Sequence, residues 1–311
     1  MKTAIVTGAN GFVGSALVQE LLQSNYEIYA LVREGHCENV PDSSRVQIVP
    51  FELSCVEECQ KKLPKAPYDA FYHFAWEGSA GAARADTRLQ LNNAQWTVEA
   101  LQTASKLGCK RFLCAGSIME HETIAAVYAQ GNRPGKGYIY GGGKLIAHAM
   151  CMPVAAQLGI DLLWPEITNA YGAGERSPRL VNTTIQKCIR GESPQFTSGT
   201  QNYDFVYIDD VARAFRLIGE NGKPFHEYLI GSSAARSLKS FLQEMQKAIA
   251  PDLPFRFGDI PFTGIDLPLS QFDCSRTEAD TGFRARISFG EGCKRTMEWW
   301  KEIDGKNDTE I

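Results

Sequence analysis

Hydrophobic residues in the first half of the chain follow two alternating patterns, one typical of buried strands and the other of amphipathic helices. Six short apolar runs, closed by glycine, proline or polar residues, predict strands. They cover residues 3–6, 27–32, 46–51, 69–75, 110–115 and 161–164. Apolar residues at helical spacing predict helices over residues 12–22, 89–107 and 140–158, the last of which Pro153 is expected to disturb.

Beyond about residue 170 the pattern loosens, and prolines interrupt it repeatedly. Helical spacing is still clear over residues 180–190, 238–249 and 290–303, and residues 304–311 are expected to fray. Strands that alternate with helices need crossover connections, which favour a parallel sheet with helices on both faces. The sequence therefore predicts an α/β fold with a doubly wound parallel sheet and a smaller C-terminal region.

Composition narrows the class of protein. The 311 residues are 44% hydrophobic and 22% charged, and the formal net charge is −4. A chain of this size can bury a core without disulfides, and it lacks the basic balance typical of nucleic-acid partners. Without an apolar run of roughly 20 residues, it predicts no membrane partner and a cytoplasmic location. The nine cysteines have no Cys-x-x-Cys spacing, so we expect reduced thiols that pack as small hydrophobes.

Three glycines lie between the first predicted strand and the first predicted helix. Gly8 suits a tight turn, Gly11 lets the backbone approach a pyrophosphate, and Gly14 lets helix and strand pack closely. The helix that starts after this turn presents free N–H groups to phosphate. The position of the motif predicts a Rossmann-type dinucleotide site with a nicotinamide cofactor. Its other predicted cofactor contacts are Asn10, Phe12 and Val13.

The end of the second predicted strand bears on the choice between NAD and NADP. Enzymes that prefer NAD place an acid there to bind the ribose hydroxyls, but Val32 and Arg33 occupy this position. A guanidinium suits a 2′-phosphate, so Arg33 favours NADP, while contact of Glu34 with the ribose stays open as an alternative. After the third strand, Glu52 and Leu53 are expected to meet the adenine.

A serine, a tyrosine and a lysine follow in an order that suits proton transfer. Ser117 ends the fifth predicted strand, and Tyr140 and Lys144 share one face of the next helix. A nearby ammonium stabilises a phenolate, and the serine hydroxyl can hold a substrate oxygen beside the tyrosine. We therefore predict that these three residues are catalytic. Residues 141–143 are all glycine, which indicates either close approach of a ligand or a fraying helix end.

Together these motifs resemble those of the extended short-chain dehydrogenase/reductases, in the NAD-dependent epimerase/dehydratase group, over nearly the whole chain. Matching segments are residues 7–14 (Thr-Gly-x-x-Gly-x-x-Gly), 72–75 (the strand along the cofactor), 169–172 (Asn-x-Tyr-Gly) and 203–212 (Arg-Asp-Phe-x-x-x-x-Asp-Val-Ala). Ser117, Tyr140 and Lys144 match the catalytic residues of the group. The resemblance implies a cofactor domain over residues 1–170, to which about 200–235 return, and a substrate-binding cap over most of 171–311. It implies further cofactor contacts from Phe74, Ala75, Trp76 and Asn93, as well as from Tyr140 and Lys144.

Departures from the family pattern affect the choice of reaction. Glu166 and Tyr203 stand where the family usually has arginines, and the second of those often contacts the nucleotide diphosphate. The related dehydratases carry Asp-Glu directly after the catalytic hydroxyl, whereas this chain has Ile118 and Met119, with Glu120 one position later. These differences weigh against dehydration and keep a non-sugar substrate open.

The resemblance also places the substrate. It implies a flexible loop over the sugar at residues 76–81 and a second substrate region near residues 176–196. The candidate substrate-binding residues are Glu77, Met119, Glu120, Asn169, Arg176, Arg179 and Phe196. His73 and His121 have no metal-ligand spacing and His148 is expected to pack in the fold, so no metal site is predicted.

The favoured function is an NAD(P)-dependent oxidoreductase that reduces a keto group of a small-molecule substrate, a nucleotide-linked (6-deoxy) sugar, with Tyr140 as proton donor. One alternative is a nucleotide-sugar epimerase with tightly held NAD, and another is a reductase of a non-sugar carbonyl. A third is a non-catalytic nucleotide-binding protein, against which the intact Ser117, Tyr140 and Lys144 argue. By analogy with the family, a homodimer is expected through the helices at 89–107 and 140–158.

Overall fold

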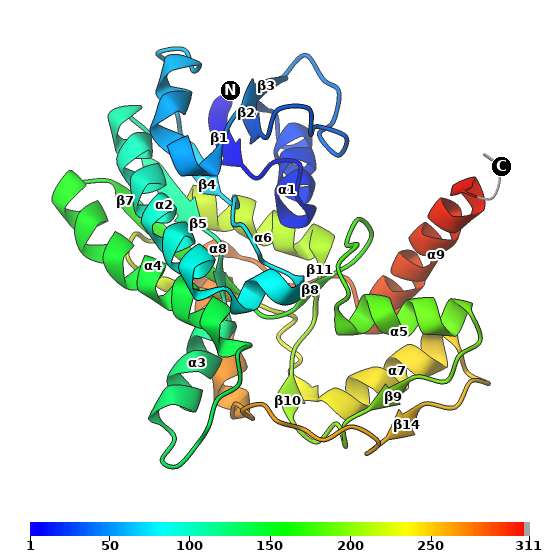
Figure 1. Ribbon diagram of the computed structural model, residues 1–311. Helices are drawn as coiled ribbons and strands as arrows, with labels where there is room; N and C mark the ends of the chain where they lie inside the picture. Colours follow the sequence, from blue (N-terminus) through cyan, green and yellow to red (C-terminus); the bar gives the residue numbers. More distant parts are fainter. Residues whose placement is uncertain (308–311) are drawn as a thin grey trace.

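A parallel sheet forms the centre of the computed structural model, which describes residues 1–307 and the side chains of residues 1–303 (Figure 1). The strand order is β12-β7-β5-β4-β1-β2-β3, with β6 paired to β7, and all these pairings are parallel. The strands are β1 (Lys2–Thr7), β2 (Tyr26–Val32), β3 (Val46–Pro50), β4 (Ala70–His73), β5 (Arg111–Cys114), β6 (Gly116–Ser117), β7 (Asp161–Ile167) and β12 (Glu227–Ile230). The order in which successive strands are added to the sheet reverses between β1 and β4: strands β2 and β3 lie on one side of β1, and the later strands lie on the other side. This reversal confirms the predicted doubly wound Rossmann fold.

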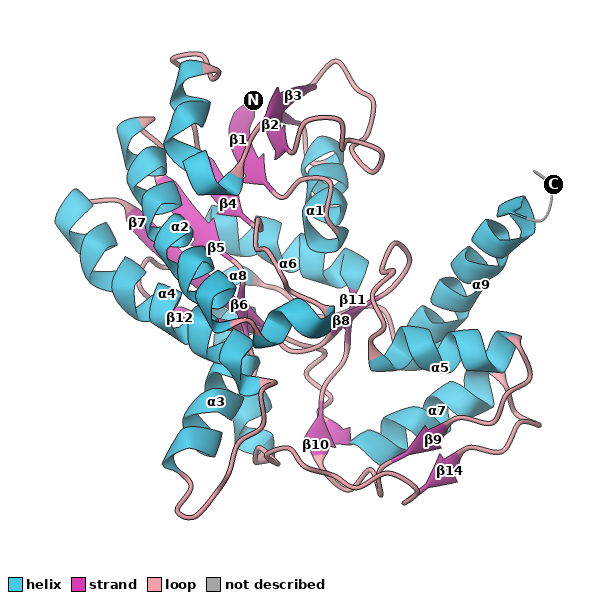
Figure 2. Cartoon of the chain, viewed as in Figure 1, coloured by secondary structure: helices cyan, strands magenta, loops and turns pink. Residues whose placement is uncertain are grey.

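Helices cover both faces of this sheet (Figure 2). Helix α1 (Phe12–Gln23) packs beside α6 (Ile208–Asn221), and α2 (Thr87–Lys106) packs beside α4 (Tyr138–Leu158). Successive side chains of a strand point to opposite faces, so β1 contributes Val6 to the core under α1 and Ile5 to the core under α2. Burial on both faces explains why the strands read as continuous apolar runs.

Pro153 does not interrupt its helix, contrary to the sequence-based expectation. Helix α4 continues through Pro153 to Leu158. Proline removes the hydrogen bond to the carbonyl four residues earlier, here that of Ala149. Both residues are exposed, so water can satisfy the freed carbonyl.

The second half adds a smaller lobe, seen at the lower right of Figure 1. It contains α5 (Leu180–Ile189), α7 (Leu238–Ile249), α9 (Phe289–Asn307), β9 (Gln195–Phe196) and β14 (Arg256–Phe257). The expected fraying at residues 304–307 is wrong, because α9 includes them, and residues 308–311 lie outside the described part. The remaining elements are α3 (Met119–Tyr128), α8 (Ser275–Thr281), β8 (Ala170–Tyr171), β10 (Asn202–Tyr203), β11 (Val206–Tyr207), β13 (Arg236–Ser237), and the 3₁₀ segments η1 (Leu53–Lys61), η2 (Gly81–Ala85) and η3 (Leu269–Phe272).

Segments from the second half of the chain join the sheet domain. Strand β12 pairs with β7, and α6 lies against α1. Asp204 accepts hydrogen bonds from the backbone N–H and the hydroxyl of Ser232, and Asp210 accepts from the N–H groups of Arg286 and Ile287. These buried carboxylates join segments of the second half of the chain to one another. The division into a cofactor domain and a substrate cap stays a prediction.

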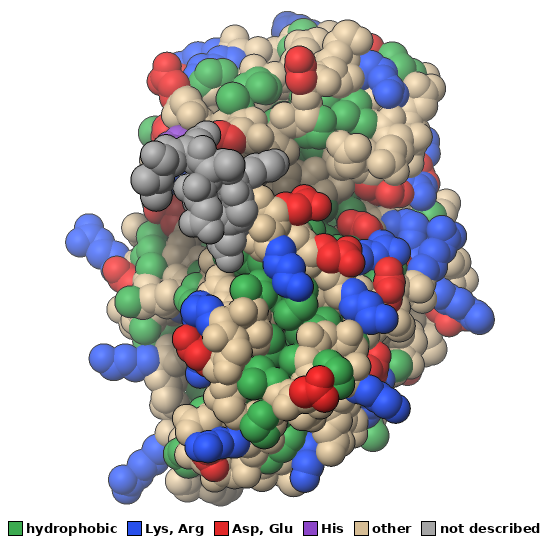
Figure 3. All heavy atoms as spheres, turned by 90° about the vertical axis from the view of Figure 1, so that its right-hand side faces the viewer, with side chains coloured by type: hydrophobic (Ala, Val, Ile, Leu, Met, Phe, Trp, Pro, Cys, Tyr) green, Lys and Arg blue, Asp and Glu red, His purple; other side chains and the backbone are tan. Residues whose placement is uncertain are grey.

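The surface and the helices of the described chain bear on the membrane prediction. No helix within residues 1–307 is long and apolar enough to cross a membrane. On the face in Figure 3, acidic and basic side chains are intermixed over much of the surface.

All nine cysteines are free thiols, and six are buried as expected. Cys37 and Cys55 are exposed, so these two do not pack in the core, whereas the partly buried Cys188 packs against it.

Candidate active site

The glycine turn after β1 borders a cleft of about 730 Å³ at the carboxyl ends of the central strands. Gly8 has a φ of +66°, a left-handed conformation that favours glycine. A Cβ atom on Gly14 would lie 2.1 Å from the carbonyl oxygen of Gly8, so only a hydrogen fits there. Gly11 caps α1 without a side-chain hydrogen bond, which leaves the N–H groups of the first turn open to phosphate. This arrangement fits a dinucleotide.

Most of the predicted cofactor contacts line this cleft. They are Gly8, Asn10, Gly11, Phe12, Val13, Gly14, Arg33, Leu53, Phe74, Ala75, Trp76, Tyr140 and Lys144. His36 lines it as well, beside Arg33, and sequence reasoning missed it. Glu52 and Asn93 do not line it: Glu52 precedes η1 on the surface, and Asn93 is buried behind the cleft.

Tyr140 and Lys144 stand on the first two turns of α4 and face the cleft. The Lys144 ammonium donates a hydrogen bond of 2.8 Å to the carbonyl of Ala115 and lies 3.7 Å from the centroid of the Trp76 ring. It lies 6.0 Å from the centroid of the Tyr140 ring, and its side chain is buried. Ser117 lines the same cleft at the end of β6, where its hydroxyl accepts the N–H of Met119. The structure therefore brings the three predicted catalytic residues to one cleft.

His73, at the end of β4, is a buried neutral side chain next to this site. It is fully buried, and desolvation, followed by the charge of Lys144, lowers its pKa to about 3. Its Nδ1 lies 2.9 Å from the hydroxyl oxygen of Thr7, which accepts the N–H groups of Phe74 and Ala75. These contacts lock the ends of β1 and β4 together beneath the cleft.

The segment after β4, expected to be a flexible loop, is held by side chains of α2. The Asn93 amide donates to the carbonyl of Glu77 at 2.8 Å and accepts the Glu77 N–H at 2.9 Å. Gln90 accepts from Trp76 Nε1 and donates to the carbonyls of Gly78 and Ala83. Asn93 is thus a structural residue, and η2 has a defined place beside Tyr140.

A second cavity of about 380 Å³ adjoins the first. Ser117 and Tyr140 line both cavities, so their hydroxyl groups, which the sequence predicts to be catalytic, lie where the two cavities meet. Met119, Asn169 and Arg179 of the predicted substrate residues line the second cavity, and Glu77 lines the first.

Two buried polar atoms among the residues of the second cavity lack hydrogen-bond partners. They are the hydroxyl of Ser177 and Oδ1 of Asn182. The Asn182 amide nitrogen donates to two backbone carbonyls, so its oxygen is the free acceptor. Unpaired buried polar atoms favour a polar ligand, because leaving them unpaired costs free energy.

Three predicted substrate residues lie elsewhere. Phe196 is buried with Phe255 and Phe257 in an aromatic cluster of the smaller lobe, and it lines neither cavity. Arg176 is exposed and also lines neither. Glu120 lies behind Ser117 rather than in a cavity.

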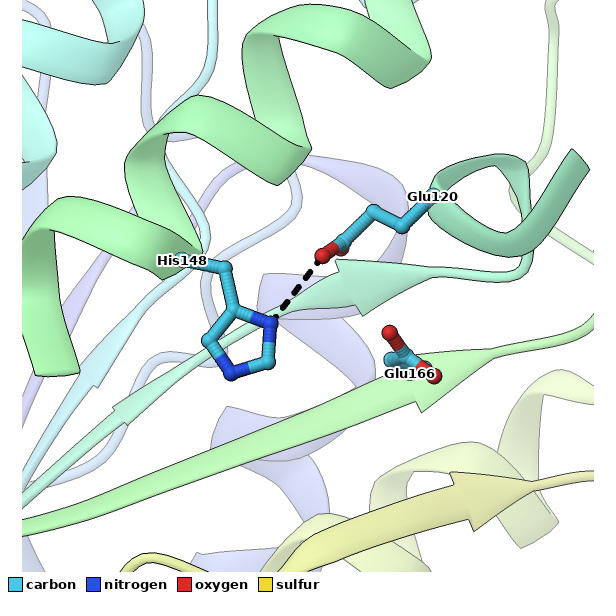
Figure 4. A group of neighbouring side chains, drawn as sticks. All are labelled: Glu120, His148 and Glu166. Atoms are coloured by element: carbon cyan, nitrogen blue, oxygen red, sulfur yellow. Dashed lines mark hydrogen bonds and ion pairs between the residues drawn. The ribbon is translucent and has the colours of Figure 1, made fainter. Parts of the chain in front are cut away.

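Glu120 belongs to a buried polar cluster with His148 and Glu166, which come from α3, α4 and β7 (Figure 4). One Glu120 oxygen accepts the N–H groups of Ser117 and Trp164, and the other lies 3.2 Å from Nδ1 of His148. Their ligand atoms lie within 4.8 Å of one another, the one such group in the described part of the chain. Because these hydrogen bonds already satisfy Glu120, we interpret the cluster as support for the backbone of Ser117.

Glu166, which replaces a family arginine, pairs with His121 at 2.6 Å. The hydrogen bond to Glu166 raises the pKa of His121 to about 9, and burial raises the pKa of the Glu166 carboxyl. The pair therefore keeps its shared proton across neutral pH. It joins α3 to β7 beside Ser117.

The glycines at 141–143 are explained by helix packing rather than by a ligand. A Cβ atom on Gly141 would lie 2.2 Å from the hydroxyl oxygen of Thr123, and one on Gly143 would lie 3.0 Å from Gln90. The helices α3 and α2 approach α4 at these two positions. Gly142 has nothing within 4 Å of such an atom.

Three charged residues of the second cavity were missed by sequence reasoning: Arg84, Glu122 and Glu175, the last of which also lines the first cavity. Arg84 comes from η2, and its guanidinium carbon lies 4.4 Å from the centroid of the Tyr140 ring. Glu122 comes from α3, one helical turn after Met119. A helix predicted from residue 119 would have placed Glu122 on the same face as Met119.

Comparisons with known proteins find a family model and curated relatives that match this chain. A family model described as the NAD dependent epimerase/dehydratase family matches residues 4–231. The dTDP-glucose 4,6-dehydratase of Streptomyces niveus is 24% identical over 321 residues, which cover 96% of this chain and 92% of that protein. A trifunctional UDP-glucose 4,6-dehydratase/UDP-4-keto-6-deoxy-D-glucose 3,5-epimerase/UDP-4-keto-L-rhamnose-reductase of Arabidopsis thaliana is 23% identical over 98% of this chain. This chain spans about half the length of that relative.

Solved structures show the same fold. The enzyme WbmF of Bordetella bronchiseptica, in complex with NAD⁺ and UDP, matches with a TM-score of 0.79 and 20% identity, over 99% of this chain and 94% of its own. The UDP-glucuronic acid 4-epimerase of Bacillus cereus, in complex with UDP-glucuronic acid and NAD, matches with a TM-score of 0.76 and 19% identity, over 97% and 100%.

Proposed function

The chain belongs to the NAD-dependent epimerase/dehydratase family, and we propose that it reduces a keto group on a nucleotide-linked sugar with Tyr140 as the proton donor. The observation that carries this proposal is the junction of the two cavities. Ser117 and Tyr140 line both of them, so a substrate in the smaller cavity meets a cofactor in the larger one at these hydroxyls.

A nicotinamide cofactor held by the glycine turn and the other residues of the larger cavity would supply a hydride for the keto carbon of the substrate. The hydroxyl of Tyr140 donates its proton to the keto oxygen, so that a C–H and an O–H bond form as the C=O bond becomes single. The ammonium of Lys144, held by Ala115, stabilises the negative charge that develops on the tyrosine oxygen. The hydroxyl of Ser117 donates a hydrogen bond to the same keto oxygen and orients it.

The test is consumption of NADPH, followed by its absorbance, with a panel of nucleotide-linked keto sugars. Turnover of at least one panel member supports reduction. An epimerase would instead interconvert two nucleotide sugars with no net change in absorbance, and that result would replace the proposed reaction. The sequence favours a 4-keto-6-deoxy sugar, which remains a prediction.

We also propose that the cofactor is NADP(H). Arg33 and His36 both line the cleft just beyond β2, where the 2′-phosphate of a bound cofactor would lie. Titration of NADPH against NADH should show at least a tenfold preference for NADPH. Arg33→Ala should remove that preference, while Arg133→Ala, in the exposed loop after α3, should not. Preference for NADH in the unmodified protein would overturn this proposal.

The proposed assembly is a homodimer through α2 and α4. These helices pack side by side and expose Leu91, Ile146 and Met150. The molar mass by light scattering should be that of two chains, and it should fall to one chain when Ile146 and Met150 are both replaced by lysine. A monomeric unmodified protein would refute the assembly.

A further inference from the structure

The guanidinium of Arg84 has an unusual environment for a partly buried charge. It offers five N–H donors, yet among the described residues it has no hydrogen-bond acceptor and no carboxylate oxygen within 4 Å of its nitrogens. The side chain is partly buried, and this burial lowers the pKa of Arg84. A desolvated guanidinium with free donors is costly unless a ligand accepts its hydrogen bonds.

The position of Arg84 indicates which part of a ligand it meets. Its side chain lies against the ring of Tyr140, with the guanidinium carbon 4.4 Å from the ring centroid. The segment that carries it is fixed, because Gln90 donates hydrogen bonds to the carbonyl of Gly78, before the 3₁₀ turn, and to that of Ala83, within the turn. Arg84 is therefore held beside Tyr140, in the cavity where the reacting group of the substrate would lie.

The other charged residues of the second cavity do not balance the positive charge of Arg84. Arg179 is paired with Glu175 at 3.6 Å. The remaining acid is Glu122, and burial raises its pKa to about 7 despite the opposing charge of Arg84. Tyr138 and Tyr203 also face Glu122 and carry no charge at neutral pH. Near neutral pH, Glu122 is partly protonated and does not fully balance Arg84.

We propose that Arg84 is a specificity-determining residue that binds a carboxylate carried by the sugar next to its reacting carbon. The inference rests on the proposed function, since Tyr140 must face the sugar. A diphosphate lies one sugar ring away from the reacting carbon, so the anion beside Tyr140 belongs to the sugar itself. Protonated Glu122 can donate a second hydrogen bond to this carboxylate. A 6-deoxy sugar carries no such group, so this proposal favours a uronic-acid type of sugar instead.

The test compares nucleotide sugars that differ only in a CH₂OH or a COO⁻ group at the sugar C6. The probes are UDP-glucose with UDP-glucuronate, GDP-mannose with GDP-mannuronate, and UDP and GDP alone. NADPH is present throughout and cannot reduce these sugars, because they carry no keto group. Dissociation constants are measured by calorimetry for the unmodified protein, Arg84→Met, Arg84→Lys and the control Arg88→Met. Arg88 is exposed on the first turn of α2 and lines neither cavity.

The proposal expects at least tenfold tighter binding of the acidic member of one pair. Arg84→Met should abolish this preference and change binding of the neutral member less than twofold, Arg84→Lys should keep part of it, and Arg88→Met should keep all of it. Equal binding of both members, or a preference that survives in Arg84→Met, overturns the proposal and leaves the proposed function intact. If Arg84→Met weakens binding of both sugars and of the free nucleotide equally, Arg84 contacts the diphosphate, and this result also overturns the proposal. Failure of every nucleotide and nucleotide sugar to bind overturns the proposed function and this inference together.

Discussion

Replacing Gly14 by alanine tests the assignment of the glycine turn as a cofactor cradle. The added Cβ atom would lie 2.1 Å from the carbonyl oxygen of Gly8 and 3.1 Å from the Cα of Ala9. Since contacts below 3.0 Å do not persist, the first turn of α1 has to move away from the end of β1 by roughly 1 Å. Overpacking of this kind costs about 1–3 kcal/mol of folding free energy. For a chain of this size, that is a melting temperature lower by roughly 2–10 °C.

The same displacement moves the N–H groups that would hold the pyrophosphate. We expect the dissociation constant for NADPH to rise by on the order of 10–100-fold, because errors of about 1 Å in a preorganised site have costs of this size. Cofactor binding is measured by the fluorescence of NADPH, and stability is measured by thermal unfolding without cofactor.

Two other glycines provide matched controls. A Cβ atom on Gly11 would lie 3.2 Å from the Gly8 oxygen, and the backbone of Gly11 is extended, so Gly11→Ala should weaken NADPH binding with little loss of stability. Gly142→Ala should leave NADPH binding unchanged and raise stability by up to about 1 kcal/mol, because alanine favours a helix more than glycine does. Unfolding and NADPH binding of Gly14→Ala that match the unmodified protein would refute the account of this turn.

Three further variants test the support of the site. Glu166→Gln removes the partner that raises the pKa of His121. The melting temperature of this variant should therefore fall most at pH 6, and the difference from the unmodified protein should shrink as pH rises through about 9. A difference independent of pH would contradict the ion pair. Asn93→Ala frees two backbone groups of Glu77, and we expect a loss of about 1–3 kcal/mol in chemical denaturation together with a raised KM. Lys144→Met should lower kcat by on the order of 100-fold in the NADPH assay, and an unchanged kcat would exclude its proposed role.

Six strands of the central sheet were predictable because both faces of the sheet are buried, whereas β6 and β12 were not assigned from the sequence. Strands such as β1 and β4 then read as continuous apolar runs, and the helices between them show a clear apolar stripe. Helix α6 carried the same signal, with Val211, Phe215 and Ile218 on one buried face, although sequence reasoning did not assign it. The short strands of the second half, two residues each, are set by tertiary pairing and leave no local pattern.

The candidate site was predictable where a motif fixes the backbone. The glycine turn, Ser117, Tyr140 and Lys144 come together as their order suggested. The substrate side was less predictable, because its charges come from segments whose conformation depends on packing. Arg84 reaches Tyr140 only because α2 holds η2 in place, and Phe196 leaves the site because an aromatic cluster buries it.

The role of Tyr140 is tested most directly by single-turnover reduction of a nucleotide-linked keto sugar in Tyr140→Phe, with NADPH binding measured on the same preparation. Phenylalanine keeps the ring that contacts Trp76 and Arg84 and removes only the hydroxyl. The account predicts an NADPH dissociation constant within about twofold of that of the unmodified protein, and hydride transfer slower by on the order of 100-fold or more. Hydride transfer at an unchanged rate would contradict the assignment of Tyr140 as the proton donor.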